Sequence, residues 1–336
     1  MTYQQVLENA RTCIGPYCKA CNDCNGKVCR NTMPGPGAKG EGTGFIRNAE
    51  KWREICVNMD TSCENSPVDT SFTLFGRTFE IPAFAAPVGA MRLHYGDKYD
   101  DLTYNDILVR ACANAGILAF TGDGTDPKVV EGAAEALKGN GVPTIKPWDM
   151  DTIREKFALV QESEPFAIAM DIDAAGLPFL QGLTPPAGSK SVEELKQIVS
   201  WAQRPFILKG IMTARGAEKA LEAGASGIVV SNHGGRVLDH CPATAEVLPD
   251  IVDAVGGKMT IFVDGAIRSG MDMFKALALG ADAVLIGRPF VTTVYGGGEE
   301  GVQLYVQKLK AELADTMRMC GAHSLADIDR SMLYGF

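Results

Sequence analysis

A histidine and an arginine stand three residues apart where an apolar run ends, in GIVVSNHGGRVLDH (residues 227–240). The run is typical of a buried strand, so its end delivers His233 and Arg236 to one place. A neutral imidazole can take a proton, and an arginine can anchor an anion through its forked donors. A hydrogen-bonded structural histidine is the alternative interpretation of His233. The close spacing of the two side chains favours an acid–base site that handles an anion.

Eight short apolar runs alternate with helical segments from about residue 77 onward. Continuously apolar runs of this length indicate strands that are buried on both faces. Segments such as 103–116 and 213–224 have helical spacing and end in Gly, which commonly stops a helix. Eight strand–helix units predict a (β/α)8 TIM barrel. The alternative, an open doubly wound sheet, more often carries a GxGxxG turn after its first strand, and that turn is absent here. The runs cover residues 81–86, 117–121, 142–146, 166–172, 206–209, 227–231, 260–264 and 283–287.

Charged side chains follow the carboxyl ends of several of these runs, where barrel enzymes carry their active residues. Asp173 follows the fourth run on the same rim as His233, where a carboxylate can orient the imidazole, and Lys209 ends the fifth. The last two runs lead into DGAIRSG (264–270) and IGRP (286–289). Glycine N–H groups and arginines in such turns are typical of a phosphate site. Turn-shaping glycines and solvated arginines are the alternative interpretation.

Four segments of the chain resemble one family of flavoenzymes. They are SNHGGRVLD (231–239), FILKGI (206–211), IPAFAAPVGAM (81–91) and FVDGAIRSGMDMFKALALGADAVLIGRP (262–289). The family is that of the FMN-dependent α-hydroxy acid oxidases and dehydrogenases, which includes glycolate and lactate oxidases. The resemblance covers roughly residues 70–295. It implies a barrel that binds FMN and oxidises a small 2-hydroxy acid to the 2-keto acid, with electrons passing to O2 or another acceptor.

The resemblance also implies a role for each matching position. His233 would be the base, and Asp173 would support it. Lys209 would stabilise the reduced flavin at its N1–C2=O edge, and Arg236 would bind the substrate carboxylate. The implied FMN contacts are Pro87, Val88, Gly89, Thr121, Gly122, Lys146, Lys209, Ser231, Asp264, Gly265, Arg268, Gly287 and Arg288.

The chain departs from the family in the substrate pocket. The family has Gln-x-Tyr after its third strand, whereas this chain has Lys146-Pro147-Trp148, so we expect Lys146 and Trp148 to contact the substrate. The family's second carboxylate-binding arginine has no counterpart in DIDAAGLPFLQG (171–182). Arg236 is therefore expected to carry more of the carboxylate binding than it does in the family.

Five of the ten cysteines crowd into one stretch, CIGPYCKACNDCNGKVC. The spacing C-x2-C-x2-C resembles that of iron–sulfur proteins, and four thiolates would equally suit structural zinc. Free thiols are the third alternative. We expect residues 1–48 to form an irregular extension that holds this metal or cluster, and residues 49–336 to form the barrel with a C-terminal helix. The candidate ligands are Cys13, Cys18, Cys21, Cys24 and Cys29.

The overall composition argues against several other classes of protein. The net charge is −9 with no basic stretch to offset it, which argues against nucleic-acid binding. No run approaches the ~18 apolar residues of a membrane span, and the polar start MTYQQVLENA lacks the apolar core of a secretion signal. We therefore expect a cytoplasmic protein, and the resemblance adds the expectation of a homotetramer. Two other functions stay open: an FMN barrel with non-redox chemistry, as in type 2 isopentenyl diphosphate isomerase, and a flavin redox sensor that signals through the cysteines.

Overall fold

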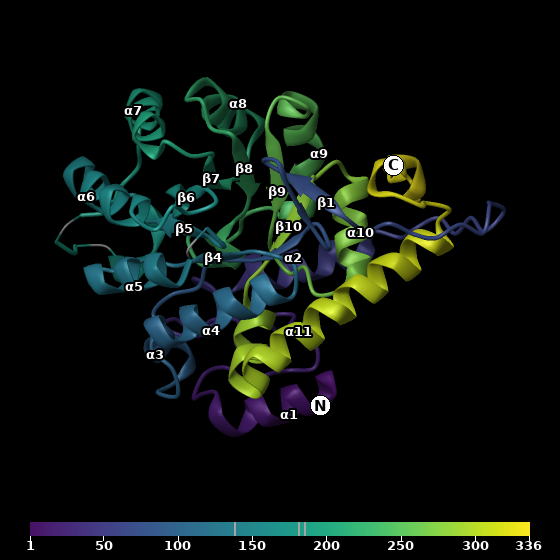
Figure 1. The fold of residues 1–336 in the computed structure, drawn as a ribbon, viewed down its shortest axis with the longest axis horizontal. Helices are drawn as coiled ribbons and strands as arrows, with labels where there is room; N and C mark the ends of the chain where they lie inside the picture. The colour runs from purple at the N-terminus through teal and green to yellow at the C-terminus, as the bar shows by residue number, and fades with distance from the viewer. Residues whose placement is uncertain (138, 181, 185) are drawn as a thin grey trace.

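The molecule is built around a closed barrel of eight parallel strands (Figure 1). The structure is a computed structural model, and it describes residues 1–137, 139–180, 182–184 and 186–336. Neighbouring strands pair in the order β10-β3-β4-β5-β6-β7-β8-β9, and β10 pairs with β3 to close the ring. The predicted (β/α)8 barrel is confirmed. The barrel strands are β3 (Ala83–Ala85), β4 (Ala119–Thr121), β5 (Gly141–Ile145), β6 (Ile168–Asp171), β7 (Phe206–Ile211), β8 (Gly227–Val230), β9 (Thr260–Val263) and β10 (Ala283–Ile286).

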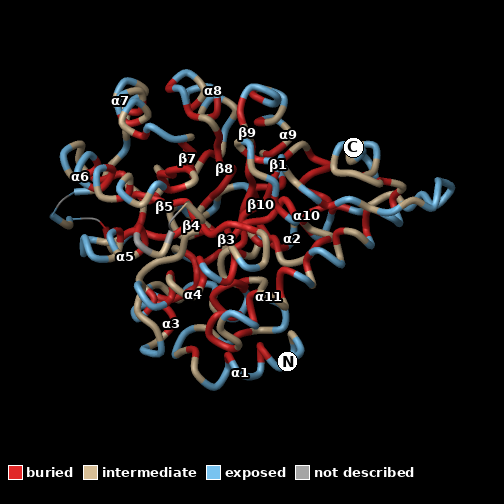
Figure 2. The backbone as a smooth tube through the Cα atoms, in the orientation of Figure 1, coloured by how far each residue is buried: buried red, intermediate tan, exposed pale blue. Residues whose placement is uncertain are grey.

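The strands form where the sequence is predominantly apolar, because both faces of each strand are covered. The helices surround the buried strands and shield their outer face (Figure 2). Almost all side chains of the strands are buried as well. Phe262 of β9 packs in the interior against Phe84 and Phe120, with ring centroids 6.2 and 6.1 Å apart. The barrel is therefore a packed core, and a ligand site must lie at one of its ends.

A helix follows each barrel strand and turns its exposed side to solvent (Figure 2). Side-chain caps start several of them, as where Ser191 and Glu194 form a capping box at the start of α7. The predicted helical segments are found within one or two residues. The outer helices are α4 (Asp101–Asn114), α5 (Pro127–Leu137), α6 (Met150–Gln161), α7 (Val192–Ala202), α8 (Ala214–Glu222), α9 (Thr244–Val255), α10 (Gly270–Ala278) and α11 (Arg288–Met319).

The N-terminal region contains more regular structure than predicted. Thr2 and Gln5 form a capping box that starts α1 (Tyr3–Cys13), which lies beside α11 (Figure 1), with Tyr3 stacked on Tyr305. A second helix, α2 (Thr43–Glu54), runs across the boundary expected at residue 48. Residues 14–42 form neither helix nor strand, as expected for the cysteine-rich part. The division into an extension and a barrel stays a prediction.

The remaining elements are short. The antiparallel strands β1 (Phe72–Leu74) and β2 (Arg77–Phe79) pack on the barrel through Phe79, whose ring meets that of Phe84 at 5.1 Å. In the part of the chain that the structure describes, no helix combines the length and the apolar character needed to cross a membrane. The other short helices are α3 (Met91–Tyr95) and the 3-10 helices η1 (Ile172–Gly176), η2 (Pro178–Leu180), η3 (His233–Gly235), η4 (Leu325–Asp327) and η5 (Arg330–Met332).

Candidate active site

A cavity of about 410 Å³ opens at the carboxyl ends of the barrel strands. Ligand sites commonly have volumes of roughly 300–1,000 Å³. Residues at or after the ends of seven strands line it, as does Lys209 near the end of β7, so the charged rim expected from the sequence is one continuous site. The predicted residues in its wall are Pro87, Val88, Gly89, Gly122, Lys146, Lys209, His233, Arg236, Asp264, Gly265, Arg268, Gly287 and Arg288.

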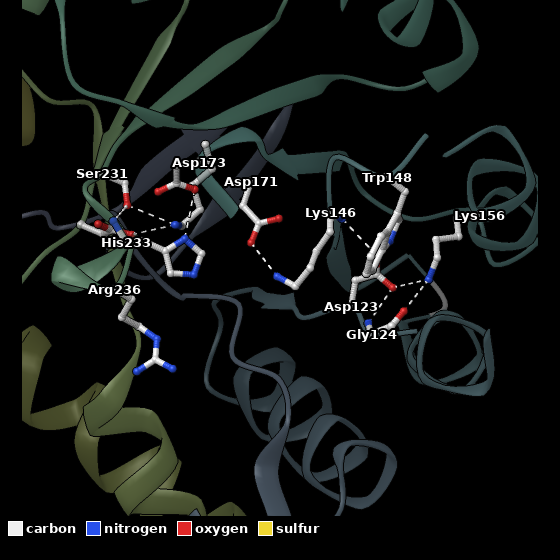
Figure 3. Close-up of polar contacts among 12 residues, drawn as sticks. Asp123, Gly124, Lys146, Trp148, Lys156, Asp171, Asp173, Ser231, His233 and Arg236 are labelled. Atoms are coloured by element: carbon white, nitrogen blue, oxygen red, sulfur yellow. Dashed lines mark hydrogen bonds and ion pairs between the residues drawn. The ribbon is translucent and has the colours of Figure 1, made fainter. Parts of the chain in front are cut away.

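His233 and Asp173 form a hydrogen-bonded pair at this wall (Figure 3). The His233 Nδ1 atom lies 3.0 Å from the Asp173 Oδ1 atom. Burial alone would raise the pKa of Asp173, but Lys209 and His233 outweigh that effect and lower it. The carboxylate therefore accepts a hydrogen bond from Nδ1–H, which leaves the lone pair of the imidazole on Nε2. Burial and the nearby Lys209 lower the pKa of His233, against the influence of Asp173, so the imidazole is neutral and can act as a base.

The backbone makes room for this pair. The register of β7 against β8 shifts between Lys209 and Ile211, and Gly210 sits at the shift with a φ of +102°. A Cβ at Gly210 would lie 2.5 Å from the Asp173 Cγ atom, so only glycine allows the carboxylate to stand there. On the other side, the Ser231 hydroxyl accepts a hydrogen bond from the His233 N–H at 3.0 Å. Both contacts fix the imidazole at the end of its strand.

Two lysines in the wall are each matched by an aspartate. The Lys209 Nζ atom donates to the Ser231 hydroxyl at 3.1 Å and lies 3.6 Å from the Asp264 carboxylate. Burial would lower the pKa of Lys209, but Asp173, Asp264 and Asp171 outweigh it and raise the pKa, so this ammonium group stays charged. The Lys146 Nζ atom lies 3.0 Å from the Asp171 carboxylate (Figure 3). The two lysines are thus balanced by two aspartates, so these four side chains together add little net charge to the site.

Trp148 does not reach the cavity, contrary to the expectation that it contacts the substrate. Its side chain is fully buried, and its indole N–H donates to the Asp123 carboxylate at 2.7 Å (Figure 3). The same carboxylate pairs with Lys156 at 2.5 Å. Trp148 therefore supports the cavity wall from behind. Thr121 and Ser231 are also buried behind the wall, and the half-buried Asp173 lies behind His233.

Arg236 lies below His233 in Figure 3, and the N-terminal segment holds its guanidinium group. Its Nη1 atom donates to the carbonyl oxygens of Gly35 and Gly37, each at 2.7 Å. Burial and the neighbouring Arg288 lower the pKa of Arg236 to about 10, which leaves it charged at neutral pH. The Nη1 group thus donates to backbone carbonyls of the protein. The Nη2 atom lies 3.3 Å from the Nε2 atom of His94, a side chain in the cavity wall.

The segment that leads into α2 packs against residues of the site and of the loop that follows it. The Asp239 carboxylate accepts hydrogen bonds from Glu41 N–H and Thr43 N–H, at 2.6 and 3.0 Å. Burial would raise the pKa of Asp239, but the bonds from Thr43 and Glu41 lower it to about 2. Arg288 donates to the Pro36 carbonyl at 2.7 Å and lies 3.7 Å from the ring centre of Phe45. The predicted extension is thus part of the site's structure.

The polar groups of the cavity fit FMN. Among the residues that the structure describes, three buried atoms in its wall have no hydrogen-bond partner: Asp171 Oδ1, Asp264 Oδ1 and Arg268 Nη2. Leaving such atoms unpaired costs about 1–3 kcal/mol each. FMN would offer N–H and hydroxyl donors to the carboxylates and phosphate oxygens to the guanidinium. The residues present therefore match the cofactor that the sequence implies.

Four of the five clustered cysteines surround a second cavity of about 220 Å³. Arg268 and Arg288 line this cavity as well as the first, so the two adjoin. Cys13 is not in this wall, since its thiol contacts the Asn9, Ala10 and Tyr295 carbonyls. Within the described ranges, no three Cys, His, Asp or Glu side chains are arranged to hold a metal ion. The structure therefore does not support the predicted metal site, and it removes Cys13 from the set. The cysteines that line the cavity are Cys18, Cys21, Cys24 and Cys29.

A model of the FMN-dependent dehydrogenase family matches residues 35–182 and 181–335, which is most of the chain. The chain belongs to the FMN-dependent dehydrogenase family. FMN is the cofactor of this family, so the comparison agrees with the cavity. The match begins at residue 35, after the last of the five clustered cysteines, and it includes the backbone carbonyls that hold Arg236 and Arg288.

Several individual relatives of the chain are named as 2-hydroxy acid oxidases. A peroxisomal (S)-2-hydroxy-acid oxidase of Oryza sativa subsp. japonica is 47% identical over 149 residues, which are 44% of this chain and 40% of that protein. An L-lactate oxidase of Roseobacter sp. is 44% identical over 146 residues, again 44% of this chain and 40% of that protein. The matches thus span about two fifths of these curated relatives. A solved mandelate oxidase variant with 2-hydroxy-phenylacetamide is 26% identical, with a TM-score of 0.81 over 99% of this chain and 97% of that one.

Sequence reasoning missed several polar residues of the wall, among them His94, Asp101 and Asp126, and one apolar part of this FMN-dependent dehydrogenase site. His94 lies in the wall five residues beyond Gly89, where the predicted contacts of the first strand stopped. Its distance from the strand end gave no signal, because a short helix returns it to the cavity. The apolar part follows β6, in the segment where the family's second arginine was sought, and consists of Leu177, Phe179, Leu180 and Leu183.

Proposed function

We propose that this protein oxidises the C2–OH of a small 2-hydroxy acid to the 2-keto acid. The observation that carries the proposal is the neutral, carboxylate-oriented His233 beside Arg236 in a cavity that fits FMN. Base and anion anchor are both needed, because the substrate must be held by its carboxylate while its hydroxyl loses a proton.

His233 would take the hydroxyl proton on Nε2, and Asp173 would stabilise the imidazolium that forms. Arg236 would hold the substrate carboxylate with the donors that Gly35 and Gly37 leave free. FMN, when bound, would accept the C2 hydrogen together with the two electrons of the oxidation. Lys209 would stabilise negative charge on the bound FMN. Three nearby aspartates outweigh the effect of burial and keep its ammonium group protonated. Electrons would then leave to O2 or to another acceptor.

The charges of the cavity favour this chemistry over the isomerase alternative. A pyrophosphate substrate would need several uncommitted cations, yet Lys146 and Lys209 are paired with Asp171 and Asp264. Arg236 is better matched to a single carboxylate. We keep the homotetramer and the cytoplasmic location as predictions.

The test is anaerobic mixing of the FMN-loaded protein with a panel of 2-hydroxy acids, followed by flavin absorbance. We expect bleaching by at least one acid and none by its neutral 2-hydroxy amide, because the anchor needs a negative charge. Air is then readmitted: rapid return of the flavin absorbance indicates an oxidase, and slow return indicates a dehydrogenase that uses another acceptor. A flavin that no 2-hydroxy acid bleaches would contradict the proposed reaction and favour the redox-sensor alternative.

We also propose that the four cysteines of the second cavity bind a soft metal, as zinc or as an iron–sulfur cluster. The proposal rests on the cavity that the four thiols share. Burial, with smaller contributions from Cys24, Cys29 and Cys21, raises the pKa of Cys18 to about 12 in the metal-free arrangement. Since no metal-binding arrangement is present in the described ranges, the thiols must move and ionise on binding. Arg268 and Arg288 in the same wall would offset the negative charge of four thiolates.

Elemental analysis of anaerobically purified protein tests this proposal. We expect one zinc, or iron with acid-labile sulfide, per chain, and we expect loss of that metal in Cys24→Ser. Cys63→Ser is the matched control, because Cys63 is exposed and lines neither cavity. Metal-free wild-type protein with titratable thiols at all four positions would contradict it.

A further inference from the structure

His94 stands between two hydrogen-bond donors. It lies in α3, is 4% exposed and forms part of the cavity wall. The Gly35 N–H points at its Nδ1 atom from 2.9 Å, and the Arg236 Nη2 atom lies 3.3 Å from its Nε2 atom. A backbone N–H and a guanidinium group can only donate, so both sides of the ring face donors.

A neutral imidazole cannot accept from both. It has one lone pair and one N–H, so only one of the two donors can be satisfied. The Gly35 N–H is buried and makes the shorter contact, which assigns the lone pair to Nδ1. The proton then sits on Nε2, where it faces Arg236 as a second donor. Two donors at 3.3 Å require an acceptor between or beside them.

The surroundings keep His94 neutral and fixed. Burial, followed by the charges of Arg236, Lys146 and Arg288, lowers its pKa to about 3. The ring packs against Phe179, with centroids 5.5 Å apart, and against Tyr95 at 6.4 Å. Protonation of the ring therefore does not supply the missing acceptor, and rotation is hindered by its neighbours.

We propose that the Nε2–H of His94 and the Nη2 group of Arg236 together bind the carboxylate of the substrate. This inference rests on the proposed function, and it names a second carboxylate ligand in a chain that lacks the second arginine of its family. A carboxylate has two oxygens with about four acceptor sites, so it can accept from both groups at once. His94 thus replaces the charged second arginine with a neutral hydrogen-bond donor that is held in place.

Three variants of His94 separate its two contacts. In His94→Asn the amide oxygen can replace Nδ1 as the acceptor for Gly35, but the side chain is too short to donate where Nε2–H does. In His94→Gln the longer amide can reach the position of Nε2 and donate. His94→Leu keeps the bulk of the side chain and loses both contacts. FMN content is measured for each protein to confirm that the cavity remains formed.

The readout is the dissociation constant of pyruvate for the oxidised, FMN-loaded protein, followed by the change in flavin absorbance. Pyruvamide is the neutral counterpart. A hydrogen bond to a charged group is worth enough to expect a roughly 10- to 100-fold weaker affinity for pyruvate in His94→Asn and His94→Leu. We expect His94→Gln to stay within a few-fold of the wild type, and pyruvamide binding to change little in all three.

Two results would overturn the inference. One is pyruvate affinity in His94→Asn equal to that of the wild type, and the other is equal weakening for pyruvate and pyruvamide. Nitrogen NMR shifts of His94 in the wild type give a test independent of variant folding, since a proton on Nδ1 would also overturn it. If pyruvate shows the expected pattern while no 2-hydroxy acid bleaches the flavin, the anchor stands and the proposed oxidation fails.

Discussion

The variant His233→Ala is expected to bind FMN and yet to lose roughly 10²- to 10⁴-fold in the rate at which 2-hydroxy acids reduce the flavin. The imidazole is neutral, and because its Nδ1 atom is bonded to Asp173 at 3.0 Å, its Nε2 lone pair is left to accept a proton. Lys146 and Lys209 are charged and paired, so neither can take its place. The measurement is the first-order rate of anaerobic bleaching at saturating substrate.

The backbone at His233 calls for a second variant. Its φ is +55°, a conformation that Asn adopts more readily than Ala does. His233→Asn should therefore fold at least as well and show a comparable loss of bleaching. His240→Asn is the matched control, because His240 is exposed in the same loop and has a φ of +57°. Bleaching by His233→Ala at the wild-type rate would show that His233 is structural.

The barrel could be predicted because its strands obey a simple rule. A strand covered on both faces is apolar at nearly every position, so all eight runs were visible in the sequence. The rim followed from the strand ends, since parallel strands deliver their carboxyl ends to one side. His233, Arg236 and Lys209 could be placed together for that reason alone.

The side-chain directions beyond the strand ends could not be predicted in the same way. Strand alternation would put Lys146 and Trp148 on one face, but β5 ends at Ile145. The backbone N–H of Trp148 donates to the Lys146 carbonyl at 2.8 Å. This tight turn directs the indole behind the cavity wall. His94 was missed for a related reason, because its contacts come from Gly35, which is distant in sequence.

The N-terminal region shows the limit of composition as a guide. Its Cys, Gly and Pro content correctly indicated the irregular stretch of residues 14–42. The same composition gave no sign that the carbonyls of Gly35 and Gly37 would hold Arg236. Such contacts pair backbone atoms with a side chain 199 or more positions away. They depend on the tertiary fold and leave no local pattern.

A second large effect is expected for Asp173→Asn, on the order of 10²-fold or more in the bleaching rate, with FMN still bound. The carboxylate holds the proton of His233 on Nδ1 and stabilises the imidazolium that forms when the substrate loses its proton. An amide can present its NH2 group to Nδ1 and so favour the tautomer with the proton on Nε2, which cannot act as the base.

The pH dependence distinguishes this role from a merely structural one. Burial and Lys209 lower the pKa of His233 from 6.5, so the wild-type rate should be level at neutral pH and fall only where His233 gains a proton, below pH 6.5. Asp173 raises the pKa of His233, so its neutralisation must lower that pKa further. In Asp173→Asn the pH-independent bleaching rate should therefore drop, and the pH at which the rate begins to fall on the acidic side should move lower. Asp250→Asn, on the exposed side of α9, should change neither. An unchanged level rate, or an acid decline that moves to higher pH, would rule out Asp173 as the group that orients His233.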